Sequence, residues 1–201
     1  MSNTGIDIEH VRETYERKTD QELIRVLTTN AHGLTPEALD IVKAEIKKRK
    51  LDPAITKAVD AQQKTFTIAE IDAYCAIIQK LPCPISGSTS ERLNATLTAE
   101  VMSFIIFTRY TKKLIIGNPD ALDKANNSAL TTTSLLGWWG FPWGIIRSIQ
   151  AINLNLKNKK ANRLDVPSPY LRQFVLANVG YIETYKGNTE KLSELLIHAM
   201  N

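Results

Sequence analysis

The sequence predicts a mainly helical α+β protein with an N-terminal helical hairpin, a small antiparallel β-hairpin and C-terminal helices packed on that hairpin. The prediction rests on a change of period. Apolar residues recur at helical spacing up to Lys80, alternate over Leu93–Val101 and return to helical spacing after Asp120. We therefore expect a helical hairpin domain over residues 1–66 and an α+β domain over residues 67–201.

The composition is that of an ordinary globular protein, with 43% hydrophobic and 23% charged residues among 201. It argues against disordered, collagen-like and disulfide-scaffold proteins. Residues 1–80 hold 12 Lys or Arg against 13 Asp or Glu, whereas residues 81–201 hold 13 against 8, giving the net charge of +4. An acidic partner would therefore meet the second part of the chain.

The cellular location is predicted from the cysteines and the apolar segments. Cys75 and Cys83 allow at most one disulfide, which favours a reducing compartment. Met1–Glu9 has no signal-peptide features. The densest apolar run, Leu135–Ile146, has 12 residues, whereas a membrane span needs roughly 20. We expect a cytoplasmic protein, with peripheral attachment to the inner membrane face as the alternative.

Two helices are expected in the first domain. Asp20 is placed to cap the first of them. Thr35 and Pro36 supply a cap and a first helical residue for the second, and the basic run Lys47–Lys50 suits its last turn. The mixed segment Asp52–Lys64 is the expected linker between the domains.

The next elements are a helix and a small sheet. Thr67–Lys80 has one apolar face that includes Cys75, which we expect in the core. The alternation over Leu93–Val101 and the apolar runs Phe104–Phe107 and Leu114–Ile116 predict two or three antiparallel strands.

Helical spacing continues to the end of the chain. Asp120 is placed to cap one helix, and another resumes after Pro142. A single amphipathic helix is expected from Ser168 to Tyr185, and Asn188 can cap the last helix. The C-terminal pair is expected to pack over the sheet.

Two similar proline turns flank the predicted strands, Cys83-Pro84-Ile85-Ser86 and Asn118-Pro119-Asp120-Ala121. A zinc ribbon places two Cys-Pro-x-Cys knuckles at such positions, and four N or S donors hold the metal. Only Cys83 can supply a thiolate here; Ser86, Asn118 and Ala121 occupy the other knuckle positions. We predict a ribbon without metal, and two unrelated proline turns are the alternative.

These features resemble parts of uncharacterised bacterial proteins. Leu34–Ala38 (LTPEA) and Glu45–Leu51 (EIKKRKL) resemble their N-terminal helical hairpin. The paired turns and Leu136–Gly144 (LGWWGFPWG) resemble a zinc-ribbon region with a GWWG-x-PWG run. The resemblance covers roughly half of the chain and implies no known reaction. Because most of the presumed ligands are replaced, it implies no metal-dependent role.

All three tryptophans fall within the segment Gly137–Gly144. Such a segment can be a buried turn, a protein interface or a shallow membrane insertion. Nucleic-acid binding would use similar residues, but no recognised motif accompanies them. The candidate partner- or membrane-binding residues are Trp138, Trp139, Phe141, Trp143, Arg147, Lys157, Lys159 and Lys160.

No catalytic motif is present. His10, His32 and His198 are scattered, and the sequence has no phosphate-binding glycine loop and no His-Glu-x-x-His helix. We therefore expect no catalytic residue, no cofactor and a non-enzymatic protein that binds the acidic surface of another protein. A small regulator or an immunity-type neutralising partner would fit. The alternatives are a peripheral membrane protein anchored by the Trp/Gly-rich segment, and an enzyme whose site no motif reveals.

Overall fold

The computed structural model describes residues 8–29, 34–51, 55 and 66–200. The chain divides into two compact units, the first made of residues 1–67 and 175–187 and the second of residues 68–174 and 188–201. The fold class is mainly helical α+β with a small antiparallel sheet, as predicted. His32 and the predicted linker Asp52–Lys64, apart from Ile55, lie outside the described residues.

The first unit is helical. Its elements are α1 (Ile8–Glu16), α2 (Asp20–Thr29), α3 (Pro36–Lys48) and α9 (Val179–Tyr185). α3 packs against α1 and α2, and α9 packs against α2. The apolar faces of the helices form an ordinary hydrophobic core of Leu23, Leu27, Leu39, Val42, Ile46 and Ile55.

The predicted start of α3 is confirmed. Thr35 Oγ1 accepts the backbone N–H of Ala38 at 3.3 Å, and Pro36 takes the first helical position. After the end of this helix, Arg49 donates to the carbonyl oxygens of Glu16 and Lys18. It therefore ties the C-terminal end of α3 to the connection between α1 and α2.

The second unit contains the sheet, which is one long hairpin of β1 (Asn94–Phe104) and β2 (Phe107–Gly117). The register runs from Asn94 opposite Gly117 to Phe104 opposite Phe107, so Ile105 and Ile106 form the turn. The sequence assigned these two isoleucines to an apolar strand. The run Leu114–Ile116 is the end of β2 rather than a third strand.

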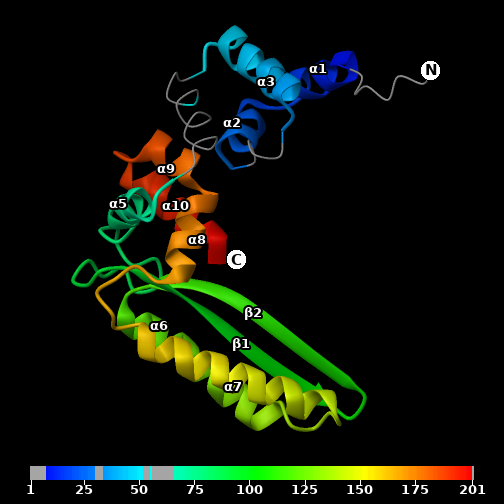
Figure 1. Ribbon diagram of the computed structural model, residues 1–201, viewed down its shortest axis with the longest axis vertical. Helices are drawn as coiled ribbons and strands as arrows, with labels where there is room; N and C mark the ends of the chain where they lie inside the picture. The colour runs from blue at the N-terminus through cyan, green and yellow to red at the C-terminus, as the bar shows by residue number, and fades with distance from the viewer. Residues whose placement is uncertain (1–7, 30–33, 52–54, 56–65, 201) are drawn as a thin grey trace. The chain divides into compact units, whose positions relative to one another are not determined.

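Two antiparallel helices, α6 (Pro119–Leu136) and α7 (Trp143–Ala161), lie along the hairpin and pack mainly on β1 (Figure 1). The N-cap of α6 is Asn118, whose Oδ1 accepts the N–H of Ala121 at 3.2 Å. The expectation that Asp120 is this cap was wrong, because Pro119 already occupies the first helical position. Asp120 instead pairs with Arg163 at 2.9 Å.

The described part of the chain also forms the helices α5 (Ile68–Ile78), α8 (Pro169–Ala177) and α10 (Thr189–Met200). The single helix expected from Ser168 to Tyr185 breaks at Asn178 into α8 and α9. Asn188 caps α10 as predicted, by accepting the N–H of Lys191 at 3.0 Å. α10 packs on β2, while α6 and α7 supply most of the cover on the sheet.

α5 and α8 are joined by a two-bond ion pair. Arg172 donates from Nε to one carboxylate oxygen of Asp72 at 2.6 Å and from Nη2 to the other at 3.0 Å. The hydrogen bond from Arg172 lowers the pKa of Asp72. Cys75, one turn along α5, is fully buried as predicted, and burial raises the pKa of its thiol to about 12.

The outer edge of β1 is covered by polar side chains instead of another strand. Its backbone groups would otherwise be unpaired. The bonds join Asn155 to both the N–H and the C=O of Ala99, Thr133 to the N–H of Val101, Asn158 to the C=O of Leu97, and Ser168 to the C=O of Ala95. These bonds explain why asparagine and threonine lie on the sides of α6 and α7 that face β1.

Within the part of the chain that the structure describes, each helix is too short or too polar to cross a lipid bilayer.

Candidate functional site

The candidate site lies at the end of the second unit where the β-hairpin turn meets the α6–α7 connection (Figure 1). Large apolar side chains are exposed there: Ile106 is 100% exposed, Ile105 84% and Phe141 83%. We call this set the apolar tip. It comprises Phe104, Ile105, Ile106, Phe107, Leu135, Leu136, Trp138, Trp139, Phe141, Trp143, Ile145, Ile146 and Ile149.

Glycines bring the backbones of the tip together. A Cβ on Gly140 would lie 2.6 Å from Thr108 Oγ1, and one on Gly144 would lie 2.6 Å from Ser103 Oγ. Ser103 and Thr108 are themselves hydrogen-bonded at 2.9 Å across the hairpin. The interior of the tip therefore has no room for a large side chain, and the bulky residues between the glycines point outward.

Two of the exposed indoles already have their polar group bonded within the chain. Trp138 Nε1 donates to the carbonyl of Ser134, and Trp139 Nε1 donates to the carbonyl of Leu135, each at 3.0 Å. The last turn of α6 supplies these acceptors, because C-terminal carbonyls lack a partner within the helix. Both rings can therefore leave water without leaving an unpaired N–H.

The turn at Ile105 and Ile106 departs from ordinary turn chemistry. Two-residue hairpin turns favour Asn, Asp and Gly, and surface loops favour polar residues. Two fully projecting isoleucines gain nothing from the fold, because their side chains are 84% and 100% exposed. Departures from a local rule of this kind are expected at functional or strained sites.

A cavity of about 370 Å³ opens at the side of the tip, between β2 and the start of α7. Its apolar wall comes from Ile105, Ile106, Phe141 and Trp143, and its polar wall from Thr108, Tyr110 and Arg147, with Gly140 also lining it. The guanidinium of Arg147 lies 5.3 Å from the centre of the Tyr110 ring, and Lys112 Nζ lies 5.5 Å from it.

Cations outnumber carboxylates behind the apolar tip, where Glu100, opposite Thr111, lies between the strand partners of Arg109 and Lys113. Arg109, Lys112 and Lys113 on β2 and Arg147 on α7 are exposed. Neither Val101–Pro119 nor Lys124–Leu164 contains a single Asp or Glu. This part of the second unit therefore has an apolar end followed by a rim with a net positive charge.

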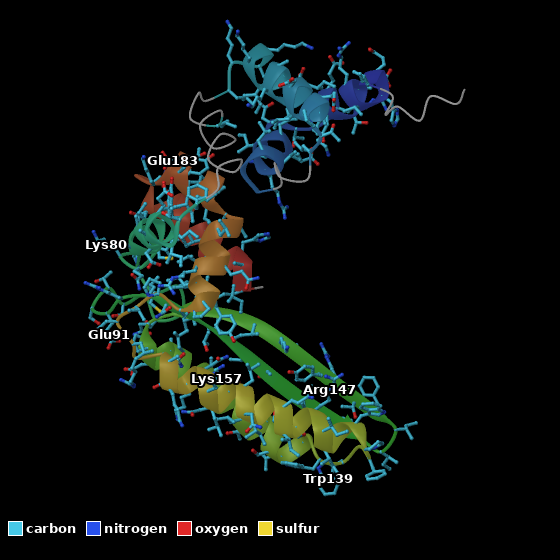
Figure 2. All side chains as sticks on the ribbon, in the orientation of Figure 1. Lys80, Glu91, Trp139, Arg147, Lys157 and Glu183 are labelled. Atoms are coloured by element: carbon cyan, nitrogen blue, oxygen red, sulfur yellow. The ribbon has the colours of Figure 1, made fainter. Side chains whose placement is uncertain are left out.

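The structure gathers five of the eight predicted binding residues at the tip: Trp138, Trp139, Phe141, Trp143 and Arg147. Figure 2 shows Trp139 and Arg147 at that end and Lys157 farther along α7. Lys157, Lys159 and Lys160 do not join the tip, because the 19-residue helix carries them roughly 20 Å away from Trp143. Lys159 instead donates to Asn127 Oδ1 at 2.8 Å.

The sequence analysis did not identify several residues of the site. Ile105 and Ile106 were assigned to a strand, and the rim residues Arg109, Lys112 and Lys113 were not singled out. The available signal was a short apolar run between two polar stretches that fits a turn as well as a strand. The alternative of a buried turn for the tryptophans is wrong, since Trp138, Trp139 and Trp143 are 41%, 69% and 61% exposed.

The two proline turns do converge at the other end of the hairpin. Cys83 Sγ lies 3.6 Å from Asn118 Oδ1 and accepts the N–H of Asn118 at 3.5 Å. Burial raises the pKa of the Cys83 thiol, but hydrogen bonds from Ser86, from the backbone of Asn118 and from Ile85 outweigh it and lower the pKa. Asn118 also bonds Ala121, so the knuckle positions form one hydrogen-bonded cluster. No group of three or more His, Cys, Asp or Glu side chains suited to a metal occurs among the described residues.

A second, polar cavity of about 520 Å³ lies near these turns. Two of its charged side chains have partners on the same unit: Glu91 accepts from Asn118 at 3.1 Å, and Arg163 pairs with Asp120 and Asp123. The lining contains no histidine or cysteine; it consists of Gln79, Glu91, Arg92, Asn94, Pro119, Asn162, Arg163, Leu164 and Asp165. The lining therefore offers no nucleophile-and-base pair built on histidine or cysteine.

Comparison of the chain with family models, with curated proteins and with solved structures finds no match.

Proposed function

We propose that this protein attaches peripherally to anionic phospholipid membranes by inserting its apolar tip into the lipid interface. The observation that carries the proposal is the arrangement of the exposed side chains. Ile105, Ile106 and Phe141 project from two adjoining connections, and a rim of four cations and one carboxylate, Glu100, follows behind them. An apolar end beneath a basic collar matches the two layers of an anionic bilayer surface.

The magnitudes are sufficient for reversible binding. Burying one Ile or Phe side chain contributes roughly 1.5–3 kcal/mol. Each Lys or Arg held near an anionic surface adds about 1 kcal/mol. Three inserted apolar side chains and the four rim cations are then enough to hold a folded protein at the interface without a membrane-spanning helix.

The shape of the tip favours lipid over a protein partner. Its most exposed residues lie on a two-residue turn and on the α6–α7 connection, so most of their surface faces outward although they also border the cavity beside the tip. A protein partner needs a complementary pocket for such side chains, whereas lipid chains adapt to any apolar shape. Satisfied indole N–H groups on Trp138 and Trp139 suit a medium without hydrogen-bond partners. Binding to an acidic protein stays a prediction from the sequence.

The test uses tryptophan emission, because all three tryptophans lie in the tip. With vesicles of phosphatidylcholine and phosphatidylglycerol, the emission should shift to shorter wavelength and the protein should sediment with the lipid. The double variant Ile105→Ser and Ile106→Ser should lose binding at least ten-fold, since about 1.4 kcal/mol corresponds to a factor of ten.

The matched control replaces two exposed isoleucines of the same unit away from the tip, Ile68→Ser and Ile197→Ser, which are 70% and 48% exposed. This control should bind vesicles like the wild type. If the wild-type protein shows neither the emission shift nor sedimentation with the vesicles, the membrane proposal is wrong. A protein partner would then be the occupant of the apolar tip to test.

A further inference from the structure

We infer that the cavity beside the apolar tip is a binding site for the phosphate of an anionic glycerophospholipid. The inference rests on the proposed membrane function and adds a defined lipid contact to it. A tip that merely inserts needs no cavity, yet this one has a volume of about 370 Å³ and two chemically different walls. Such a division matches a molecule with a charged head and apolar chains.

The apolar wall faces the inserted end of the tip. Ile105, Ile106, Phe141 and Trp143 line it, and these are the side chains that would sit among the acyl chains. The polar wall, with Thr108, Tyr110 and Arg147, begins where the basic rim begins. When the tip is inserted, the polar wall lies at the depth of the lipid phosphates, which border the hydrocarbon region.

Arg147 is held in an orientation that suits phosphate. Its guanidinium lies against the Tyr110 ring at 5.3 Å from the ring centre, within the range of a cation–π contact. Nη1 donates to Gln150 Oε1 at 3.1 Å, which is one of five N–H donors on the group. The remaining donors form the planar fork that binds two phosphate oxygens at once.

Lys112 adds a second positive charge at the same ring. Its Nζ lies 5.5 Å from the Tyr110 centre, so Tyr110 stands between the strand's lysine and the helix's arginine as a shared platform. Thr108 and Tyr110 bring hydroxyl groups to the wall. Arg147 and two hydroxyl-bearing side chains on the cavity wall, with Lys112 at the same ring, favour an anion with several acceptor oxygens.

The deciding experiment compares two double variants that remove equal charge from β2 and its surroundings. The first, Arg147→Gln and Lys112→Gln, removes the arginine that lines the cavity and the lysine that lies over the Tyr110 ring. The second, Arg109→Gln and Lys113→Gln, removes the rim cations that do not touch the Tyr110 ring; successive strand residues point to opposite faces. Partitioning of each full-length variant is measured on phosphatidylcholine vesicles with and without phosphatidylglycerol.

Diffuse attraction alone would weaken both variants alike, by about five-fold per cation. A phosphate site predicts that the cavity variant loses at least ten-fold more affinity for the phosphatidylglycerol vesicles than the rim variant. Tyr110→Leu, which keeps every charge but removes the platform, should also lose affinity. Equal losses in the two double variants would overturn the site while leaving membrane binding intact. Failure of the wild-type protein to bind any vesicle would instead overturn the proposed function itself.

A soluble lipid distinguishes the source of the phosphate. Short-chain phosphatidylglycerol, kept below its micelle concentration, should change the tryptophan emission of the protein, because Trp143 lines the cavity. Inorganic phosphate and glycerol phosphate should bind at least ten-fold more weakly, because they cannot use the apolar wall. Equal affinity for inorganic phosphate would overturn the assignment to a phospholipid.

Discussion

The first unit and the tip of the second unit place polar and apolar residues in opposite ways. In the first unit Leu23, Leu27 and Val42 are buried and charged side chains such as Glu13 and Arg17 lie outside. At the tip the buried positions include Gly140, Gly144, Ser103 and Thr133, while Ile, Phe and Trp face solvent. Two parts of one chain therefore follow different rules for what lies inside.

The difference shows what holds each part together. Apolar burial stabilises the first unit, as in most water-soluble domains. At the tip the glycines approach Ser103 and Thr108 closely, and next to the tip side chains of α6 and α7 are hydrogen-bonded to the edge of β1. Small residues inside, polar side chains as bridges and apolar residues outside reverse the arrangement of the first unit. The apolar surface of the tip thus remains available for an external partner.

The largest expected contrast comes from truncating one apolar side chain in each region. Leu23→Ala removes a fully buried side chain and should lower the free energy of unfolding by roughly 2–5 kcal/mol. Ile106→Ala removes a fully exposed one and should leave it within about 0.5 kcal/mol of wild type. Urea unfolding followed by circular dichroism measures both, and hydrogen exchange should locate the Leu23→Ala effect in α2 and α3. Similar losses in the two variants would break the comparison.

The next largest effect concerns the polar interior. Asn155 is fully buried and makes four hydrogen bonds, to both backbone groups of Ala99, to Asn126 and to the carbonyl of Ala151. Asn155→Leu keeps the size but leaves the Ala99 N–H and C=O unpaired. We expect a loss of roughly 2–3 kcal/mol in the free energy of unfolding. Ile152→Leu, a partly buried apolar exchange on the same helix, is the control. A stabilised Asn155→Leu protein would mean that the interior behaves as an ordinary apolar core.

Elements with strong local signals could be predicted from the sequence. The Thr35-Pro36 start of α3 and the Asn188 cap of α10 depend only on neighbouring residues, and both formed where predicted. The break at Asn178 was missed because the apolar spacing runs on through it, with Val175 and Ile182 both buried. Their burial, and the membership of residues 175–187 in the first unit, depend on distant parts of the chain.

The site was only half predictable for a related reason. The composition of the Trp/Gly-rich segment identified it as a candidate site. Its exposure, however, depends on glycines that pack against Ser103 and Thr108, which lie over thirty residues earlier in the sequence. The cavity also combines Tyr110 from a strand with Arg147 from a helix. The prediction included the lysines of α7 in the site only because they follow the tryptophans in sequence. Because α7 is a helix of 19 residues, these lysines lie far from the tip.

The smallest expected effect is a difference in pH dependence between the α5–α8 ion pair and the apolar tip. Arg172 lowers the pKa of Asp72, so the ion pair between α8 and α5 is fully stabilising above the ordinary Asp pKa of about 3.9 and is lost as the pH falls through the lower folded value. Both side chains are about one-third exposed, so the contribution is about 1 kcal/mol or less. The melting temperature of wild type should therefore fall more than that of Asp72→Asn between about pH 6 and about pH 3. The segments that form the apolar tip, within Val101–Pro119 and Lys124–Leu164, contain no Asp or Glu. Backbone hydrogen exchange at the tip, corrected for the intrinsic pH dependence of exchange, should therefore change with pH by the same amount in wild type and in Asp72→Asn. An acid-induced opening confined to the tip would contradict the view that close packing, rather than charge, holds it together.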